Sequence, residues 1–170
     1  MEAITMLGQT VSYSSLCLGT LKSTRVNMEM EGKIWKDGKF WLVEVPALDA
    51  MTQGKTRKEA LVMVSNLVLE MTRNYFKNEV SKDFAITIVD YKKEVIGVMT
   101  NDNRLFLALL LRRQREKSGS TVREASERLG SKSPNAYAQY ERGKTSISLD
   151  KYEALLMAAN PSERLRLRII

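Results

Sequence analysis

The stretch that decides the fold of the C-terminal half is TVREASERLGSKSPNAYAQYERGK, residues 121–144. Thr121 is a preferred N-cap residue, and Glu124 follows it at the spacing of a capping box, so a helix is expected to begin here. Gly130 can adopt the left-handed conformation that ends a helix. Pro134 suits the first position of a second helix, where no N–H donor is needed. The stretch therefore predicts two short helices joined by a tight turn.

The second of these helices has two candidate caps, Ser131 and Ser133, and it ends at Gly143. Two helices joined in this way form a helix-turn-helix, whose second helix enters the major groove of DNA. On this second helix, the 3.6-residue period places Ala136, Tyr137 and Tyr140 inward and Asn135, Gln139 and Arg142 outward.

Apolar helices are expected on both sides of the motif, over residues 105–114 and 148–159. They complete an all-α domain around the two short helices. The second flanking helix is predicted to have one apolar face, formed by Leu149, Tyr152, Leu155 and Leu156.

The end of the motif also resembles a known family. The run ERGK at residues 141–144, followed by a helix start at Ser148, is similar to the end of the Xre-type phage-repressor helix-turn-helix. The resemblance covers about residues 104–160. It departs at Val122, where such repressors often carry a phosphate-contacting glutamine, and in a second turn that is one residue longer.

Positive charge is concentrated in the same half of the chain. Residues 101–170 carry 14 lysines and arginines against 8 aspartates and glutamates, whereas residues 1–100 carry 13 against 12. Basic proteins are common, but this asymmetry is what neutralisation of DNA phosphates requires. The chain is therefore expected to bind double-stranded operator DNA.

Composition excludes several classes of protein. Cys17 is the single cysteine, so no intrachain disulfide can form and a reducing compartment is indicated. The absence of histidine excludes His-based acid–base catalysis, Ser-His-Asp triads and the common zinc sites. No apolar run is long enough to span a bilayer. We expect a cytoplasmic, nucleoid-associated protein without membrane contact.

Residues 1–25 show no clean hydrophobic period and lack the basic start of a signal peptide. They are expected to be a disordered leader or an overextended gene start, with Val26 or Met28 as the true first residue. No function is expected for this segment.

The remaining chain is expected to form two domains, residues 26–99 and 104–160, joined by a polar linker at residues 100–103. In the tail, residues 161–170, arginines alternate with leucines and isoleucine. An alternating apolar side needs cover, so a dimer contact is expected there.

The domain at residues 26–99 is predicted to be α+β with the element order ββαββ. Its first two strands are joined at Asp37-Gly38, a pair that favours a type I′ hairpin. Thr56 and Glu59 form a second capping box, which opens a long helix. The strands are expected over residues 28–34, 40–45, 84–89 and 94–99, and the apolar helix face consists of Ala60, Leu61, Val64, Leu67, Val68, Met71 and Tyr75.

The run TQGKTRKEA at residues 52–60, which follows a strand, Pro46 and Leu48, resembles the HicB antitoxin family. The resemblance covers about residues 26–99 and departs at Asp49-Ala50, where many members carry Gly-Cys. It implies a degenerate RNase H-like domain joined to a DNA-binding domain. It also implies a HicA-type partner, a small basic toxin that cleaves mRNA, and an antitoxin that represses its own operon.

The candidate toxin contacts lie in the loop at residues 48–54 and on the exposed sheet face. Thr56 and Glu59 are assigned to helix capping rather than to binding. The candidate contact residues are Leu48, Asp49, Met51, Thr52 and Gln53.

Candidate DNA contacts come from the exposed side of the helix-turn-helix. Asn and Gln suit adenine, and Ala or Ser can meet a thymine methyl, so base contacts are assigned to Ser133, Asn135, Ala136 and Gln139. Phosphate contacts are assigned to Thr121, Arg123, Lys132, Arg142 and Lys144. In the alternative reading, Tyr137 and Tyr140 are core and Arg142 merely pairs with Glu141.

An RNase H-type nuclease needs several carboxylates around divalent metal ions. The acidic residues of the first domain, Glu29, Glu31, Glu44, Asp49 and Asp90, show no such cluster in the sequence and are interpreted as solvated surface residues. We therefore expect a binding protein, with no enzymatic activity, metal or cofactor.

Two functions remain open at the level of sequence. The first is an antitoxin and autorepressor that acts as a homodimer or higher oligomer, because a palindromic operator requires two-fold symmetry. The alternative is a stand-alone phage-type repressor whose first domain senses a ligand or oligomerises.

Overall fold

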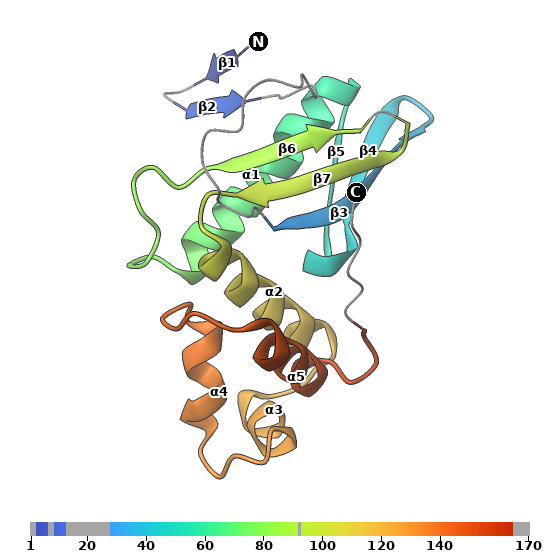
Figure 1. Ribbon diagram of the computed structural model, residues 1–170. Coiled ribbons are helices and arrows are strands. Elements are labelled where there is room, and N and C mark those ends of the chain that lie inside the picture. Colours follow the sequence, from blue (N-terminus) through green and yellow to red (C-terminus); the bar gives the residue numbers. More distant parts are fainter. Residues whose placement is uncertain (1–2, 7–8, 13–27, 92, 165–170) are drawn as a thin grey trace. The chain divides into compact units, whose positions relative to one another are not determined.

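The computed structural model describes residues 3–6, 9–12, 28–91 and 93–164 (Figure 1). The chain divides into two compact units. Residues 1–74 and 81–103 form the first unit, and residues 75–80 and 104–170 form the second.

Two short strands, β1 (Ala3–Met6) and β2 (Gln9–Ser12), pair antiparallel near the start of the chain. The prediction of a disordered leader is therefore wrong for these eight residues, and the rest of the segment at residues 1–25 lies outside the described residues. The same holds for residues 165–170 of the tail, where the dimer contact is predicted.

The main body of the first unit is an antiparallel sheet of five strands with α1 (Arg57–Tyr75) behind it in the view of Figure 1. The sheet confirms the α+β class but has one strand more than predicted. The strands follow the spatial order β5-β4-β3-β7-β6 and comprise β3 (Glu29–Asp37), β4 (Phe40–Val45), β5 (Ala50–Gly54), β6 (Ile86–Asp90) and β7 (Val95–Thr100).

The extra strand is β5, which replaces the predicted loop at residues 48–54. A short 3-10 helix, η1 (Pro46–Leu48), ends at Asp49, whose φ of 48° turns the chain back along β4. Aspartate tolerates this left-handed conformation better than most residues. Gly54, at the end of the Thr-Gln-Gly motif, favoured a turn in the sequence. The structure instead shows the burial alternation of a strand, with Ala50 and Gly54 buried and Met51 exposed.

The predicted hairpin between β3 and β4 is present, but its turn type differs. Asp37 pairs with Phe40, so Gly38 and Lys39 are the two central residues. Of these, only Gly38 has a positive φ (54°). A type I′ turn needs positive φ at both central residues, whereas type II′ needs it at the first. The hairpin therefore has the pattern of a type II′ turn.

The start of α1 confirms the predicted cap at Thr56. Its hydroxyl oxygen accepts a hydrogen bond from the Glu59 N–H (3.1 Å). The Glu59 carboxylate accepts from the Lys55 N–H (2.7 Å) rather than from Thr56, one residue earlier than in a standard capping box. The cap fixes where β5 passes into α1.

The core of the first unit lies between α1 and one face of the sheet. On α1, Leu67, Met71 and Tyr75 are only half-buried, contrary to prediction, while Leu69 and Thr72 are buried. The buried stripe is therefore rotated relative to the predicted one, because the sheet that packs on the helix, and not the sequence period alone, decides which side of the helix is buried. The core consists of Ile34, Val43, Val45, Ile88, Ile96 and Val98 from the strands and Ala60, Leu61, Val64 and Val68 from α1.

The alternate side chains of the same strands form the opposite side of the sheet, which we call the open face. On β3, β4 and β5, where buried and accessible residues alternate, these side chains are exposed or half-buried. The open face includes Glu29, Glu31, Lys33, Trp35, Phe40, Leu42, Glu44, Met51, Gln53 and Val95.

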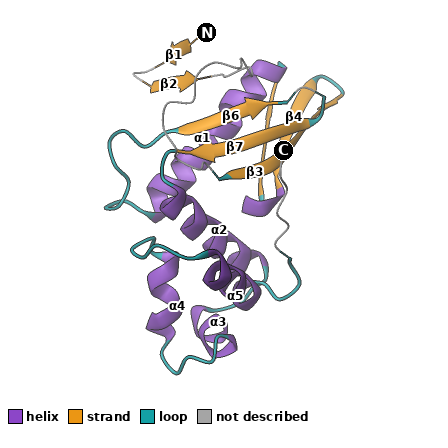
Figure 2. Ribbon diagram, viewed as in Figure 1, coloured by secondary structure: helices purple, strands orange, loops and turns teal. Residues whose placement is uncertain are grey.

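The described part of the second unit is helical (Figure 2). Its helices are α2 (Asn103–Lys117), α3 (Val122–Arg128), α4 (Pro134–Glu141) and α5 (Leu149–Ala159). Among the described residues, no helix is long and apolar enough to cross a membrane. The core gathers Phe76, Leu105, Leu109, Tyr137, Tyr152 and Leu155.

On α5, the predicted apolar face is right at Tyr152, Leu155 and Leu156 but wrong at Leu149, which is 52% exposed. Ser148 is the N-cap, and its hydroxyl oxygen accepts from the Lys151 N–H (3.4 Å). Leu149 is thus the first helical residue, where the helix has not yet come against the core.

Candidate DNA-binding surface

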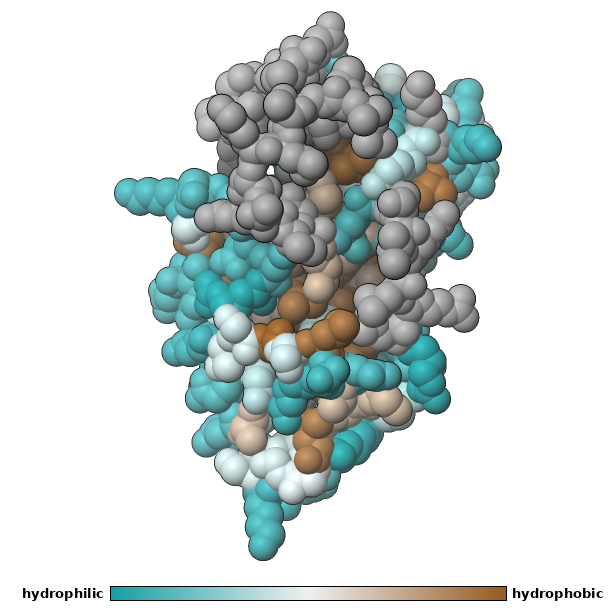
Figure 3. All heavy atoms as spheres, in the orientation of Figure 1, coloured by the Kyte–Doolittle hydropathy of each residue, from teal (hydrophilic) through white to brown (hydrophobic). Residues whose placement is uncertain are grey.

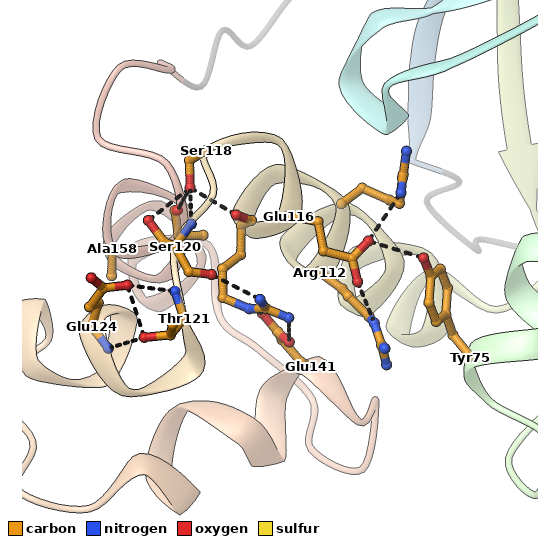
Figure 4. A network of polar contacts seen from close by, with 12 residues as sticks. Tyr75, Arg112, Glu116, Ser118, Ser120, Thr121, Glu124, Glu141 and Ala158 are labelled. Atoms are coloured by element: carbon orange, nitrogen blue, oxygen red, sulfur yellow. Dashed lines mark hydrogen bonds and ion pairs between the residues drawn. The ribbon is translucent and has the colours of Figure 1, made fainter.

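The first helix of the motif, α3, begins with the predicted capping box at Thr121 and Glu124 (Figure 4). The Thr121 N–H and hydroxyl both donate to the Glu124 carboxylate (2.6 and 2.9 Å), and the Glu124 N–H donates back to the Thr121 hydroxyl oxygen (3.2 Å). The backbone N–H of Thr121 and then its hydroxyl lower the pKa of Glu124. The helix start is thereby fixed by a reciprocal pair.

The turn between α3 and α4 is built on Gly130, whose φ is 73°. The Gly130 N–H donates to the Glu127 carbonyl (2.9 Å), and the Ser131 N–H reaches the Ser126 carbonyl (3.0 Å). The Ser126 hydroxyl donates to the Ser133 carbonyl (2.7 Å), which joins α3 directly to the start of α4. This set of bonds fixes the direction in which α4 leaves the turn.

Of the two candidate caps of α4, Ser133 occupies the N-cap position, and Pro134 follows it as predicted. The Ser133 side chain makes no capping bond. The Ser131 hydroxyl instead accepts from the Ser133 N–H (3.3 Å).

The orientation of α4 is set by two buried positions one turn apart, Tyr137 (0% exposed) and Glu141 (6%). Ala136 is exposed and Tyr140 is only half-buried, contrary to the prediction that both face inward. An eight-residue helix touches the core along one narrow stripe, so a neighbour of Tyr137 already lies outside it. The stripe leaves Asn135 and Gln139 on the exposed side.

A buried ion pair between Arg115 of α2 and Glu141 of α4 holds this orientation. The Arg115 Nε and Nη2 atoms lie 2.6 and 2.9 Å from the two carboxylate oxygens of Glu141, and its Nη1 donates to the Ser120 carbonyl (3.0 Å). The side chains are 13% and 7% exposed. The alternative in which Glu141 pairs with Arg142 is therefore wrong.

Sequence reasoning missed this pair, although a signal was present. Glu141 follows the buried Tyr137 by four residues, which places it on the buried side of the helix. A buried carboxylate needs a partner, and the arginines at the end of α2 were the candidates.

A second cluster surrounds Glu116 (Figure 4). Its carboxylate accepts from the Tyr75 hydroxyl, the Arg112 Nε and the Arg113 Nη1, each at 3.0 Å. The Arg112 guanidinium also lies 4.0 Å from the centroid of the Tyr75 ring. Together with Arg115, these contacts commit the three arginines at the C-terminal end of α2 to internal partners, and Arg104 near its start donates to the Gly143 carbonyl.

We expect the Glu116→Gln variant to lose acid-sensitive stability of the second unit. Burial raises the pKa of Glu116, but the hydrogen bonds from Arg112 and Tyr75 lower it by more. The pKa of Glu116 in the folded protein is therefore below its ordinary 4.5. The folded protein thus binds fewer protons here than the unfolded chain, so the contribution is full above pH 4.5 and is lost as the pH falls through the lower folded value. Urea unfolding at pH 7 and pH 3 should differ by about 1 kcal/mol less in the variant.

A third group of bonds attaches α3 to the neighbouring elements. The Arg128 Nη1 donates to the Ser120 hydroxyl and to the Ala158 carbonyl at the end of α5, both at 2.9 Å. The buried Asn160 amide donates to the Gln114 side-chain oxygen (3.1 Å). These bonds make a rigid frame for the two helices of the motif.

The structure places all nine predicted DNA contacts at exposed positions. The Thr121 hydroxyl proton is used within the capping box, and Arg123 pairs with Glu127 (3.0 Å) in an exposed contact. Hydrophilic and neutral colours predominate over α3 and α4 in Figure 3. The nine residues come from the start of α3, the turn, α4 and the segment after it: Thr121, Arg123, Lys132, Ser133, Asn135, Ala136, Gln139, Arg142 and Lys144.

The second unit is a helix-turn-helix domain. It has two short helices joined by a glycine turn, and polar bonds to the flanking helices hold them in place. Residues 111–160 match the helix-turn-helix family model, of the Xre type, which corresponds to DNA binding and transcription regulation. A comparison of the whole chain with curated proteins found no match.

The predicted toxin contacts of the first unit have different positions. Leu48 is fully buried, because η1 directs its side chain into the core, so it cannot contact a partner. Thr52 is half-buried on the α1 side of β5. Asp49, Met51 and Gln53 are exposed, with Met51 55% accessible.

Two of the acidic residues that were interpreted as solvated, Asp90 and Glu29, instead have structural contacts. Arg57 binds both carboxylate oxygens of Asp90 (3.0 and 2.7 Å). Glu29 accepts from the Tyr91 hydroxyl (2.8 Å). Burial, and then this bond, raise the pKa of Tyr91 to about 12. Within the described residues, no group of three or more Cys, Asp or Glu residues is arranged to hold a metal ion.

Proposed function

We propose that this chain is an antitoxin and autorepressor. Its second unit reads operator DNA as part of a dimer, and its first unit neutralises a small basic toxin of the HicA type. The proposal is for a binding protein without catalysis or cofactor. The observation that supports the DNA-binding part is the exposed polar side of α4, held by the Arg115–Glu141 pair.

The chemistry of α4 suits base recognition. Asn135 and Gln139 are four residues apart, so their amides lie on the same side of the helix, and amides pair bidentately with adenine. Ala136 presents a methyl group beside them, which fits a thymine methyl. Positive charge comes from exposed residues around the helix, namely Arg123, Lys132, Arg142 and Lys144.

Base and phosphate contacts are separable by substitution. We expect Gln139→Ala to relax preference at one base pair, with a loss of about 1–3 kcal/mol for the cognate operator and little for random DNA. Lys144→Ala should weaken both DNAs equally and reduce the salt dependence by about one counterion. Fluorescence anisotropy with both DNAs over a salt series measures these effects. The assignment fails if Gln139→Ala weakens all DNA alike or Lys144→Ala changes base preference.

The open face of the first unit suits a basic partner. Its strands carry the carboxylates of Glu29, Glu31 and Glu44 against the single ammonium of Lys33. Large apolar side chains lie among these charges, with Phe40 40%, Val95 37% and Met51 55% exposed. Exposed apolar area with complementary charge is typical of a protein interface. Together with Gln53 and Asp49, this face is the proposed toxin surface.

Capture from the native host with tagged full-length protein tests the partner. We expect a small basic protein at stoichiometric intensity, whose cleavage of mRNA stops when an equimolar amount of this chain is added. The Glu44→Lys variant on the open face should weaken that inhibition, whereas Glu70→Lys on α1, with the same change of charge, should not. If no such partner is found and operator DNA still binds, the chain is a stand-alone repressor.

One observation favours this rival. The first unit has an open groove of about 740 Å³ that contains both tryptophans, Trp35 and Trp41. Four cations, Lys33, Lys36, Arg57 and Lys93, outnumber two carboxylates, Glu44 and Glu94, in its lining, and Arg57 lies 5.3 Å from the centroid of the Trp41 ring. Aromatic rings beside cations suit a small aromatic anion, so a ligand sensor is the second candidate function.

A further inference from the structure

The strand β5 forms one edge of the sheet in the first unit. Strand order places β5 at one end of the sheet, and β4 is its pairing neighbour within the described part of the chain. Its register with β4 runs without interruption from Ala50 to Gly54, so the strand carries no bulge. One side of its backbone is therefore a straight row of hydrogen-bonding groups.

Exposed edge strands are usually protected against pairing by charges, proline or bulges. The sequence of β5, AMTQG, contains neither charge nor proline. Charges occur only at its two flanks, Asp49 on one side and Lys55 on the other. Such an edge is a template for another strand rather than a protected end.

The charges that flank β5 indicate which strand would pair with it. In an antiparallel pair of two β5 strands around a two-fold axis, opposite residues must point to the same face of the sheet, so their residue numbers must sum to an even value. The axis at Thr52 is the one that pairs all five residues of both strands. It also brings Asp49, in the turn before β5 of each copy, near Lys55, which follows β5 of the other, so opposite charges meet at both ends of the interface.

We propose that two copies of this chain join through their β5 strands, centred on Thr52, to form one continuous ten-stranded antiparallel sheet. Met51 of each copy lies opposite Gln53 of the other on the open face. The interface is isologous, with the closed symmetry that most homodimers have. It uses the backbone edge, so the side chains of the open face on β3, β4 and β7 stay accessible, while Met51 and Gln53 lie at the seam.

The inference rests on the proposed dimeric repressor, because a helix-turn-helix that reads a palindrome needs a two-fold partner. It goes further by naming the interface. Failure of the interface and failure of DNA binding are separable, because the first is tested below without DNA and the second by operator titration.

Disulfide trapping tests both the interface and its register. In full-length protein with Cys17→Ser, the double variant Met51→Cys and Gln53→Cys places two thiol pairs directly opposite one another, about 4.5–5.5 Å apart at Cα. We expect a covalent dimer on a non-reducing gel after mild oxidation. Each single variant pairs only diagonally, at about 7–8 Å, and should stay monomeric on the gel. A dimer by light scattering that the double variant does not trap, or trapping by Met51→Cys alone, overturns the proposal.

A charge swap provides the matched control. Lys55→Asp sets like charges near Asp49 at both ends of the interface, and we expect a dimer Kd about tenfold higher in sedimentation equilibrium. Adding Asp49→Lys reverses the order of the charges and should restore the dimer. An unchanged Kd in Lys55→Asp overturns the register.

Discussion

Glu141→Ala is expected to destabilise the second unit by about 3–5 kcal/mol, which is a large part of the stability of a small domain. The substitution leaves the guanidinium of Arg115 in a site where its side chain is only 13% exposed, without the carboxylate that compensates it. The lost attraction matters less than this uncompensated charge. Unfolding in urea followed by far-UV circular dichroism measures the change.

The two units can be followed separately in this experiment. Both tryptophans, Trp35 and Trp41, belong to the first unit, so tryptophan fluorescence reports on the sheet while circular dichroism also reports on the helices. We expect the double variant Arg115→Met with Glu141→Leu to recover most of the loss, since no charge remains buried. Arg123→Ala, which removes the exposed ion pair with Glu127, should cost less than about 1 kcal/mol. A loss as small as this for Glu141→Ala would contradict the assignment of the Arg115–Glu141 pair as buried.

Gly54→Ala is expected to destabilise the first unit by about 2–3 kcal/mol. A Cβ atom at this position would lie 2.9 Å from both the Cα of Ala60 and the carbonyl carbon of Glu59, and would be closest to the Ala60 nitrogen. These are backbone atoms in the first turn of α1, which cannot rotate away. Either β5 or α1 must shift. Gly54 lies opposite Trp41 in the register, so the shift should also change the tryptophan emission.

Gly97→Ala is the matched control for steric crowding in the same sheet. A Cβ atom at Gly97 would meet the side-chain carboxyl group of Glu29, which is the flexible end of a side chain and can move aside. The cost should be about 1 kcal/mol, mainly the bond between Glu29 and Tyr91. Equal effects at the two glycines would show that α1 and β5 adjust to each other more readily than their geometry indicates.

The sequence predicted the elements whose ends carry their own chemistry. Thr121, Glu124 and Gly130 fixed α3 and its turn because capping bonds form between residues three to five positions apart, and such spacings can be read directly. The same is true of Thr56 at the start of α1. The helix-turn-helix was predictable for this reason.

The features that the sequence did not reveal depend on contacts between distant segments. Nothing near Ala50 indicates that β4 pairs with it, and an edge strand of five residues has too weak a pattern to outweigh a Thr-Gln-Gly turn signal. The Arg115–Glu141 pair joins residues 26 positions apart, and only the fold decides which arginine reaches the carboxylate. Burial of Leu48 likewise follows from the path of η1 rather than from its neighbours in sequence.

The Arg115–Glu141 pair also has a consequence for the order in which the domain is made. Arg115 leaves the ribosome 26 residues before Glu141. At ordinary elongation rates of 5–20 residues per second, its charge waits about 1–5 s for a partner. During that time the guanidinium of Arg115 has no carboxylate to pair with, so its burial is unfavourable. With only eight residues, α4 is too short to be stable as a helix until it packs against α2. A nascent chain is therefore expected to gain the proposed DNA-binding surface in one late step, after synthesis has passed Glu141.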